Sequence, residues 1–325
     1  MAQVRRRWLP VGAGVLMIGL VPVIVGDSLP GRPIGGPTAT TPTWITPRPT
    51  RRQPDPEPTD VVAVLLAAGD IASCNSSGDE VTGRMLDSLA GRIALLGDIA
   101  YGYGSAANFS ECFDPSWGRH RGRMRPAIGN HEYMTAGGAP YFAYFGSAAG
   151  EPARGYYSYD LGAWHVVVLN SNCDRVSCAA GSAQERWLRA DLASSGRRCT
   201  LAYWHHPLFT SGANHPGLTE VRPLYQALYD AGAEVVLAGH NHQYERFAPL
   251  APNGTHDPAG GIRSFVVGTG GGSHYPFGTV KPYSEARNST AYGFLRLTLR
   301  STSYSWQFVP EPGKTYQDSG TGTCH

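Results

Sequence analysis

The pattern of hydrophobic and polar positions along the chain predicts short buried strands separated by a few helices. The strands are apolar runs, often rich in β-branched side chains and bounded by glycine or polar residues. They lie at residues 61–68, 93–96, 164–169, 200–204, 233–238, 264–267 and 294–299. Two helices are predicted at residues 184–193 and 220–231, because the apolar residues of each segment recur along one stripe.

A β-hairpin is predicted where the runs 156–159 and 164–169 are joined across Leu161 and Gly162. Strands that alternate with helices favour a layered α/β fold, and the hairpin adds an antiparallel pair to the sheet. The pattern therefore predicts an α/β domain with a mixed sheet, which occupies residues 61–325.

The first 60 residues have a different pattern. Arg5, Arg6 and Arg7 precede an apolar run at residues 8–25, as in a secretory signal peptide or a membrane anchor. We assign residues 1–26 to this targeting segment. Residues 27–60 hold nine prolines and many threonines, and this composition predicts a disordered, semi-rigid linker. The protein is expected to be exported, and either secreted or anchored at the outer face of the cytoplasmic membrane.

Composition excludes several other classes of protein. Hydrophobic residues make up 42% and charged residues only 16% of the 325 residues, so the chain as a whole is not disordered. A formal net charge of +2 gives no footprint for nucleic-acid binding. The six cysteines allow up to three disulfides, in any of 15 pairings. Cys173 with Cys178 is the best local pair, and a disulfide from Cys324 would tie down the C-terminus.

Four of these apolar runs, and a shorter one at residues 127–128, end in residues that can bind metal ions. The tips are Gly69-Asp70, Gly97-Asp98, Gly129-Asn130-His131, His205-His206 and Gly239-His240-Asn241-His242. The carboxyl ends of strands in an α/β sheet form one edge, so these side chains are expected to converge there. Carboxylate, amide oxygen and imidazole suit borderline divalent and trivalent metals, and the donors are enough for two ions that share a carboxylate.

Each tip also has a structural explanation when it is taken alone. Gly-Asp is common in turns, Asn-His-Glu suits a helix N-cap, and a histidine at a strand end can simply be buried. The Gly-His-x-His tip is harder to explain by packing. The occurrence of all five tips in one chain favours a metal centre.

The ordered set resembles the motifs of the calcineurin-like metallophosphoesterases, and within them the purple acid phosphatase branch. The resemblance covers residues 61 to about 310 and implies a four-layer α-β-β-α sandwich with mixed sheets. Many members of the family have a histidine two residues after the first aspartate, where this chain has Ala72. Tyr101, three residues after Asp98, matches the tyrosine of the purple branch, although it could instead be a stacking residue beside Tyr103.

The resemblance implies a role for each matching residue. Three residues would hold a first metal: Asp70, Tyr101 and His242. Three would hold a second: Asn130, His205 and His240. Asp98 would bridge the two ions. A tyrosinate ligand implies Fe³⁺ at the first site, together with a divalent ion (Fe²⁺, Zn²⁺ or Mn²⁺) at the second.

Further residues are expected to act on the substrate or to support those that do. The resemblance implies that His131 contacts the phosphate and protonates the leaving group, and that Glu132 orients His131. His215 lies where the purple branch has another substrate histidine, or is a histidine of a surface loop. His206 is a candidate for a supporting role. The glycine-rich segment 268–275 is expected to form a wall of the pocket, with Tyr275 and Phe277 available to the organic part of the substrate.

The function that follows is an exported, acid-phosphatase-like enzyme with a dinuclear metal site. It would hydrolyse small phosphate monoesters by in-line attack of a metal-bound hydroxide. A phosphodiesterase or nucleotidase with the same metals is an alternative. Another is a non-catalytic surface binding protein that keeps the fold, although the intact ligand set argues against it. The pattern does not determine the oligomeric state.

Overall fold

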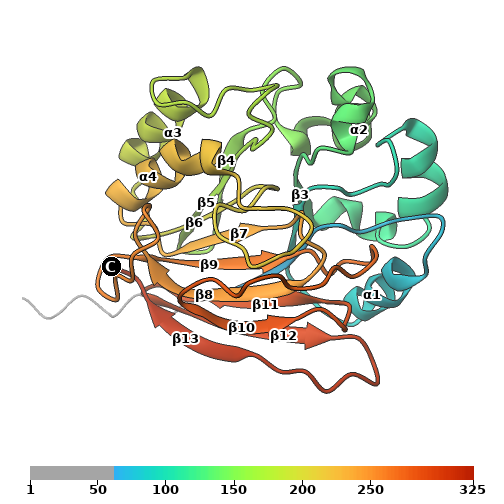
Figure 1. Cartoon of the computed structure of the whole chain (residues 1–325). Helices are drawn as coiled ribbons and strands as arrows, with labels where there is room; N and C mark the ends of the chain where they lie inside the picture. Colours follow the sequence, from blue (N-terminus) through green and yellow to red (C-terminus); the bar gives the residue numbers. More distant parts are fainter. Residues whose placement is uncertain (1–61) are drawn as a thin grey trace, which may run out of the picture. The chain divides into compact units, whose positions relative to one another are not determined.

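The computed structural model describes residues 62–325. The signal or anchor and the linker that the sequence predicts lie outside these residues. The described part contains two β-sheets flanked by helices (Figure 1). Within residues 62–325, no helix has both the length and the apolar character that a membrane span requires.

The first sheet has six strands in the order β13-β12-β11-β1-β2-β3. β1, β2 and β3 are parallel to one another, and the other neighbours are antiparallel. The strands are β1 (Ala63–Ala68), β2 (Arg92–Leu96), β3 (Met124–Ala127), β11 (Gly293–Leu299), β12 (Ser303–Pro310) and β13 (Ser319–Thr323).

The second sheet has seven strands in the order β10-β8-β9-β7-β6-β5-β4. Its centre, β5-β6-β7-β9, is parallel, while β4, β8 and β10 pair antiparallel with their neighbours. The strands are β4 (Tyr157–Leu161), β5 (Trp164–Val168), β6 (Cys199–Tyr203), β7 (Val235–Ala238), β8 (Tyr244–Leu250), β9 (Ile262–Val267) and β10 (Ser284–Asn288). The predicted hairpin is confirmed as β4-β5, and both sheets are mixed.

Alternating side chains of β5 show how the layers are held together. Val166 and Val168 belong to the large core that the two sheets share. Val167, between them, belongs to a second core, where it packs with Leu188 and Leu224 from the flanking helices. Successive side chains of a strand point to opposite faces, so a continuous apolar run such as this marks a strand that is buried on both faces.

Helices flank the two sheets, which gives four layers (Figure 1). The longer helices are α1 (Gly78–Asp87), α2 (Ala139–Phe145), α3 (Ala183–Ser194) and α4 (Arg222–Asp230). Shorter helical turns are η1 (Asn108–Phe113), η2 (Gly118–Arg123), η3 (Glu132–Met134), η4 (Ala136–Gly138), η5 (Gly146–Ala149) and η6 (Thr219–Val221). α3 and α4 confirm the two predicted helices. α1 and α2 were not predicted, and the expected four-layer sandwich is confirmed.

All six cysteines are paired. The disulfides are Cys74–Cys112, Cys173–Cys178 and Cys199–Cys324. The expected local pair is therefore confirmed, and so is the disulfide that ties the C-terminus to the folded unit, where it joins the chain at the start of β6.

Candidate metal centre

The polar tips of five strands meet where the carboxyl ends of the two sheets come together. Asp70, Asp98 and Asn130 follow β1, β2 and β3 of the first sheet. His205 follows β6, and His240 and His242 follow β7 of the second sheet. Backbone contacts join the sheets here, since Gly69 N donates to the carbonyl of Val267 at the end of β9 (2.9 Å). The site is thus assembled from both sheets.

The side chains form two groups with one carboxylate between them. In the first group, the hydroxyl of Tyr101 lies 2.9 Å from Asp70 Oδ1 and 2.9 Å from His242 Nε2. In the second, His205 Nε2 lies 3.0 Å from Asn130 Oδ1 and 3.1 Å from His240 Nδ1. Asp98 Oδ2 reaches both groups, at 3.4 Å from the Tyr101 hydroxyl and 3.2 Å from His205 Nε2.

The backbone is held in an unusual conformation at three of these residues. Asp70, Asp98 and His240 have positive φ angles of 59°, 48° and 71°. Non-glycine residues in this region cost about 1–3 kcal/mol each and concentrate at functional sites. Gly129, which precedes Asn130, permits close packing of the turns, since a Cβ there would lie 2.2 Å from Asp98 Oδ1. The unusual backbone conformations thus coincide with proposed metal ligands.

Two of the histidines are oriented by backbone carbonyls. The Nδ1 of His205 contacts the carbonyl oxygen of Leu96 (2.8 Å), and the Nδ1 of His242 contacts the carbonyl of Ser273. A carbonyl can only accept, so each Nδ1 carries a proton. In both residues this turns Nε2 towards the site, where the loss of any proton on Nε2 would leave it able to bind a metal ion.

The hydrogen-bond partners of Glu132 differ from those that the sequence predicts. Its buried carboxylate accepts hydrogen bonds from four backbone amides, those of Gly129, Asp98, Ile99 and Ala100, at 2.8–3.3 Å. Described contacts with the His131 ring do not include it. The expectation that Glu132 orients His131 is therefore wrong: Glu132 fixes the loop that carries Asp98.

His131 and His215 both lie at the site. His131 Nδ1 contacts the carbonyl of Gly102 (2.6 Å), and its Nε2 lies 3.8 Å from Asp98 Oδ2. The ring of His215 lies against that of His240, with ring centroids 4.2 Å apart and planes inclined by 34°. The side chain of His131 is 27% exposed, and His215 is half-buried, so a bound substrate could reach both rings.

His206 is held by Ser171, a residue that the sequence did not single out. The Oγ of Ser171 accepts hydrogen bonds from the amides of His205 (3.2 Å) and His206 (2.9 Å). The same oxygen lies 2.9 Å from His206 Nδ1. Since two amides use the acceptor positions of the hydroxyl, its proton points to Nδ1. One side chain thus fixes both histidines at the end of β6.

The glycine-rich segment 268–275 lies directly against the first group. The amides of Gly270 and Gly272 donate to the carbonyls of Gly69 and Asp70 (2.9 and 2.8 Å). Tyr275 stacks on His242, with ring centroids 3.9 Å apart and planes inclined by only 10°. This segment therefore supports the turn at residues 69–70, which carries Asp70. It also lines the site, as the sequence predicts.

The electrostatics of the site favour an added cation. Burial alone would raise the pKa of Asp98, yet the charge and hydrogen bond of His205 hold it well below its usual range. Burial alone would lower the pKa of His205, but Asp98 raises it to about 9. Burial, followed by Asp70 and Asp98, raises the pKa of Tyr101 well above its usual value. The buried acids thus require positive charge, which a metal ion provides.

The donor set fits metal binding. Ligand atoms of Asp70, Asp98 and His205 lie within 4.8 Å of one another, and so do those of His205, His206 and His240. Oxygen and imidazole donors suit iron, zinc and manganese. A third cluster of Cys199, Glu234 and Cys324 is of another kind, because its two sulfurs are joined in a disulfide.

Comparisons with known proteins agree with this arrangement. The family model described as calcineurin-like phosphoesterase matches residues 50–244. Purple acid phosphatase 15 from Arabidopsis thaliana is 26% identical over 257 residues, which are 68% of this chain and 47% of that protein. Purple acid phosphatase 22 from the same plant is 34% identical over 163 residues, covering 46% of this chain and 36% of the relative. The chain thus spans between a third and a half of these relatives.

Solved structures share the fold. Purple acid phosphatase PPD1 from yellow lupin (Lupinus luteus) matches with a TM-score of 0.69 at 18% identity, over 81% of this chain and 54% of that one. GAP50, described as the anchor in the inner membrane complex of Plasmodium, matches with a TM-score of 0.65 at 11% identity, over 82% of this chain and 90% of that one. At these identities the likeness concerns the fold alone.

Proposed function

Because the chain belongs to the calcineurin-like phosphoesterase family, we propose that it is a metal-dependent phosphatase that hydrolyses small phosphate monoesters. The observation that carries this proposal is the position of Asp98, whose Oδ2 reaches Tyr101 in one group of donors and His205 in the other. A carboxylate between two such groups suits a dinuclear centre. The purple acid phosphatases among the relatives support the same reading.

We assign the ligands by these two groups. Asp70, Tyr101 and His242 would hold the first ion, Asn130, His205 and His240 would hold the second, and Asp98, between the two groups, would serve both. The phenolate of Tyr101 favours Fe³⁺ in the first site, with Fe²⁺, Zn²⁺ or Mn²⁺ in the second. When bound, the two ions would activate a water molecule as the nucleophile and would neutralise charge on the phosphoryl oxygens.

The residues around the ions bind the substrate and donate a proton to its leaving group. The Nδ1 proton of His131 is held by the carbonyl of Gly102, so a second proton, carried on Nε2, would be the one that passes to the leaving oxygen. His215 faces the same space from the opposite loop, beside His240, and contacts the phosphate. Tyr275, stacked on His242, closes the side of the site next to the first group.

Export is part of the proposal. Three disulfides among residues 62–325 are typical of proteins that fold in an oxidising compartment. The basic and apolar segment at residues 1–26 has the composition of an export signal or a membrane anchor. Together they favour a protein that works outside the cytoplasm, attached to the membrane or released.

The test combines metal analysis with a pair of substrates. The purified protein is expected to contain two metal ions per chain and to hydrolyse an aryl phosphate monoester faster than the corresponding diester. Asp98→Asn is expected to lose at least 10³-fold in kcat, because catalysis of this kind depends on both ions. Near-normal turnover by this variant would refute the bridging role.

The remaining outcomes separate the alternatives. Faster cleavage of the diester would favour a phosphodiesterase with the same centre. If two metal ions are bound and neither ester is cleaved, the chain is a binding protein on the phosphoesterase fold and the proposed activity is wrong.

A further inference from the structure

His206 follows the proposed ligand His205 in the chain, but its ring is held in a different way. The Nδ1 atoms of His205 and His242 contact backbone carbonyls, so each of them carries a proton. The Nδ1 of His206 instead lies 2.9 Å from the hydroxyl oxygen of Ser171. A hydroxyl can donate as well as accept, so the other bonds to this oxygen decide which of the two atoms carries the proton.

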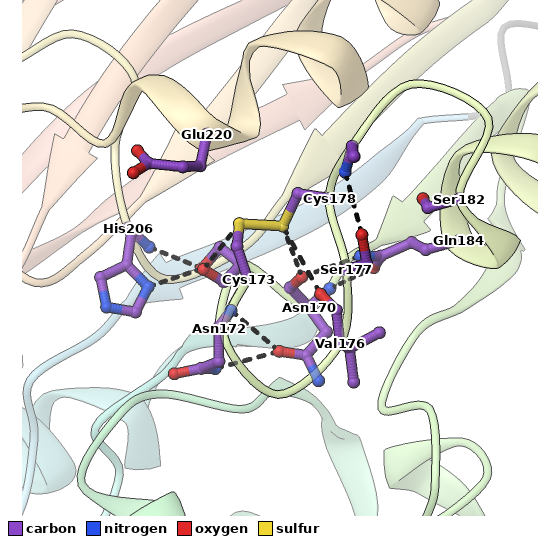
Figure 2. Close-up of a disulfide and its surroundings, with 12 residues drawn as sticks. Asn170, Asn172, Cys173, Val176, Ser177, Cys178, Ser182, Gln184, His206 and Glu220 are labelled. Atoms are coloured by element: carbon purple, nitrogen blue, oxygen red, sulfur yellow. Dashed lines mark hydrogen bonds between the residues drawn. A yellow bond between two sulfur atoms is a disulfide. The ribbon is translucent and has the colours of Figure 1, made fainter. Parts of the chain in front are cut away.

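The hydroxyl oxygen of Ser171 already accepts two hydrogen bonds, from the amides of His205 (3.2 Å) and His206 (2.9 Å). In Figure 2, two dashed lines from His206, one from its backbone and one from its ring, meet at a single oxygen. Because two amides use the acceptor positions of this hydroxyl, its own proton is donated to Nδ1 of His206. Nδ1 is therefore an acceptor, and the neutral ring carries its only proton on Nε2.

This tautomer removes His206 from the set of metal ligands. One ligand atom each of His205, His206 and His240 lie within 4.8 Å of one another, so position alone would allow all three to bind an ion. A histidine that binds a metal ion through one nitrogen keeps a proton on the other and donates it to an acceptor. In His206 the other nitrogen accepts instead, so Nε2 could bind an ion only if the ring lost its last proton. Nε2 is left as an N–H donor.

This donor lies beside the proposed second ion. The ring centroid of His206 is 4.4 Å from that of His240 and 4.8 Å from that of His205. His206 is partly exposed, and it lines a groove of about 410 Å³ together with Asn130, the third proposed ligand of the same ion. Among residues 62–325, no hydrogen bond reaches Nε2 of His206. A ligand that enters the second site from this groove therefore comes close to an unused donor.

We propose that His206 is a substrate-binding residue, which donates from Nε2 to a phosphoryl oxygen of a monoester at the second ion, and that Ser171 is its positioning residue. The inference rests on the proposed function and assigns a further residue to the same site. A phosphoryl oxygen is a charged acceptor, and hydrogen bonds to such acceptors are stronger than those between neutral groups. Because the ring is neutral, it adds this bond without adding charge to a site that holds two cations.

The tautomer can be measured directly on the full chain loaded with Zn²⁺. ¹⁵N NMR of the histidine rings distinguishes protonated from unprotonated nitrogens, and the signals that are missing from His206→Gln belong to His206. We expect a neutral ring with its proton on Nε2. A proton on Nδ1, or a zinc ion on Nε2, would overturn the inference.

Two substitutions at position 206 separate the hydrogen bond from the size of the side chain. The amide of glutamine can place an N–H near the position of Nε2, whereas phenylalanine fills the space without a donor. Calorimetry with inorganic phosphate on the metal-loaded full chain should show binding weakened about tenfold or more in His206→Phe and within about threefold of the wild type in His206→Gln. Equal affinities in the wild type and His206→Phe would contradict the proposal.

Metal content shows whether His206 acts on the substrate or on the ions. Mass spectrometry should find the wild-type content in both variants at position 206, and the loss of an ion from His206→Phe would make His206 a ligand and refute the inference. The matched control is His256→Phe, at an exposed histidine that stacks on Tyr283 with ring centroids 5.3 Å apart. This control should keep the wild-type affinity for phosphate.

The positioning role of Ser171 has its own test. Ser171→Ala removes the hydroxyl that donates to Nδ1, so the NMR signals of His206 should move towards a mixture of both tautomers. Phosphate binding should weaken in Ser171→Ala, but the same substitution should cost no further affinity in the His206→Phe background. A further loss there, or an unchanged tautomer in Ser171→Ala, would overturn the positioning role.

These measurements also separate the inference from the proposed function, because phosphate binding and the ring tautomer do not depend on turnover. If no ester is cleaved but His206→Phe weakens phosphate binding about tenfold, the assignment of His206 is correct and the phosphatase proposal is wrong. If monoesters are cleaved and the affinity for phosphate does not depend on His206, the phosphatase proposal stands and this inference is wrong.

Discussion

Asn241 donates a hydrogen bond from Nδ2 to the backbone carbonyl of His215, at 3.0 Å. Asn241 lies between His240 and His242, and it also reaches Thr210 Oγ1 (3.3 Å). One buried amide thus ties the turn with two proposed ligands to the loop that brings His215 to the site. The loop is also held two residues earlier, where the amide of Ala213 donates to the carbonyl of Pro276 (3.1 Å), so the bond from Asn241 fixes it at His215 itself.

Replacing Asn241 by alanine should therefore act through His215. We expect kcat/KM for an aryl phosphate to fall about tenfold, because the loop loses its hydrogen bond at His215 while the two flanking histidines remain. Metal content, measured by mass spectrometry, should stay at the wild-type value. The loss should be no greater in the double variant Asn241→Ala/His215→Ala than in His215→Ala alone; additive losses would contradict the link. Asn253→Ala, at an exposed turn, is the matched control.

Glu132→Gln should destabilise the fold. The carboxylate accepts from four backbone amides, and a glutamine leaves one oxygen and turns an amino group towards two N–H donors. An unsatisfied buried donor costs about 1–3 kcal/mol, so we expect a loss of about 2 kcal/mol or more in the free energy of unfolding. Urea denaturation measures it. A change as small as that of the exposed control Glu151→Gln, within about 0.5 kcal/mol, would show that the amides find other partners.

Replacing Tyr101 by phenylalanine should change the visible absorption of the iron-loaded protein and leave its fold intact. A phenolate bound to Fe³⁺ gives a visible charge-transfer band, and phenylalanine has no oxygen to supply it. We expect the iron-loaded variant to lose the band, while Tyr103→Phe, at a 68% exposed position in the same loop, keeps it. Absorption spectra of both variants with measured iron content provide the test. An unchanged band in Tyr101→Phe would assign the iron to other ligands.

The convergence of the polar residues at the strand ends could be predicted because two simple rules apply to them. A buried run such as 235–238 is recognisable from its β-branched and aliphatic residues, and a parallel sheet brings the ends of its strands to one edge. The residues that support the tips could not be found in this way. Ser171, Asn241 and Glu132 act through backbone groups that are distant in sequence, and a local pattern carries no trace of those partners.

The C-terminal strands show a second limit. β13 (Ser319–Thr323) contains Gly320 and Gly322, which have low strand propensity, and was not predicted. In the structure these glycines face aromatic rings of β12: a Cβ at Gly320 would lie 2.3 Å from Trp306, and one at Gly322 would lie 2.4 Å from Tyr304. The rings cover the glycines and favour the strand. Propensity fails here because the stabilising contact is supplied by the neighbouring strand.

The disulfides should differ in their contribution to stability. Cys199–Cys324 has a sequence separation of 125 and Cys173–Cys178 one of 5. In the chain-entropy model, closing the longer loop stabilises by about 5 kcal/mol and closing the shorter one by about 2 kcal/mol. We therefore expect the alanine pair at 199 and 324 to lose more than the alanine pair at 173 and 178 in urea denaturation. Equal losses, or the reverse order, would contradict the prediction.

The free energy of unfolding should also depend on pH through Glu234, whose described contacts include none of the proposed metal ligands. Its Oε2 accepts from the amide of Thr200 (2.6 Å), and its Oε1 accepts from the amide of His325 (3.2 Å). Burial raises the pKa of Glu234 to about 7, above its ordinary value of 4.5. The folded state thus holds a proton that the unfolded state releases between these two pH values.

The sign follows from this difference in proton binding. Between pH 4.5 and 7 the folded state binds more protons at Glu234, so the free energy of unfolding falls as the pH rises. The loss is roughly 3 kcal/mol across this window, and it is absent below it. Glu234→Gln removes the titrating group and should flatten the pH profile of urea denaturation between pH 5 and 7 by most of that amount. Asp230→Asn, which removes an exposed acid at the end of α4, should leave the slope unchanged. A variant at 234 that keeps the wild-type slope would place the titrating group elsewhere.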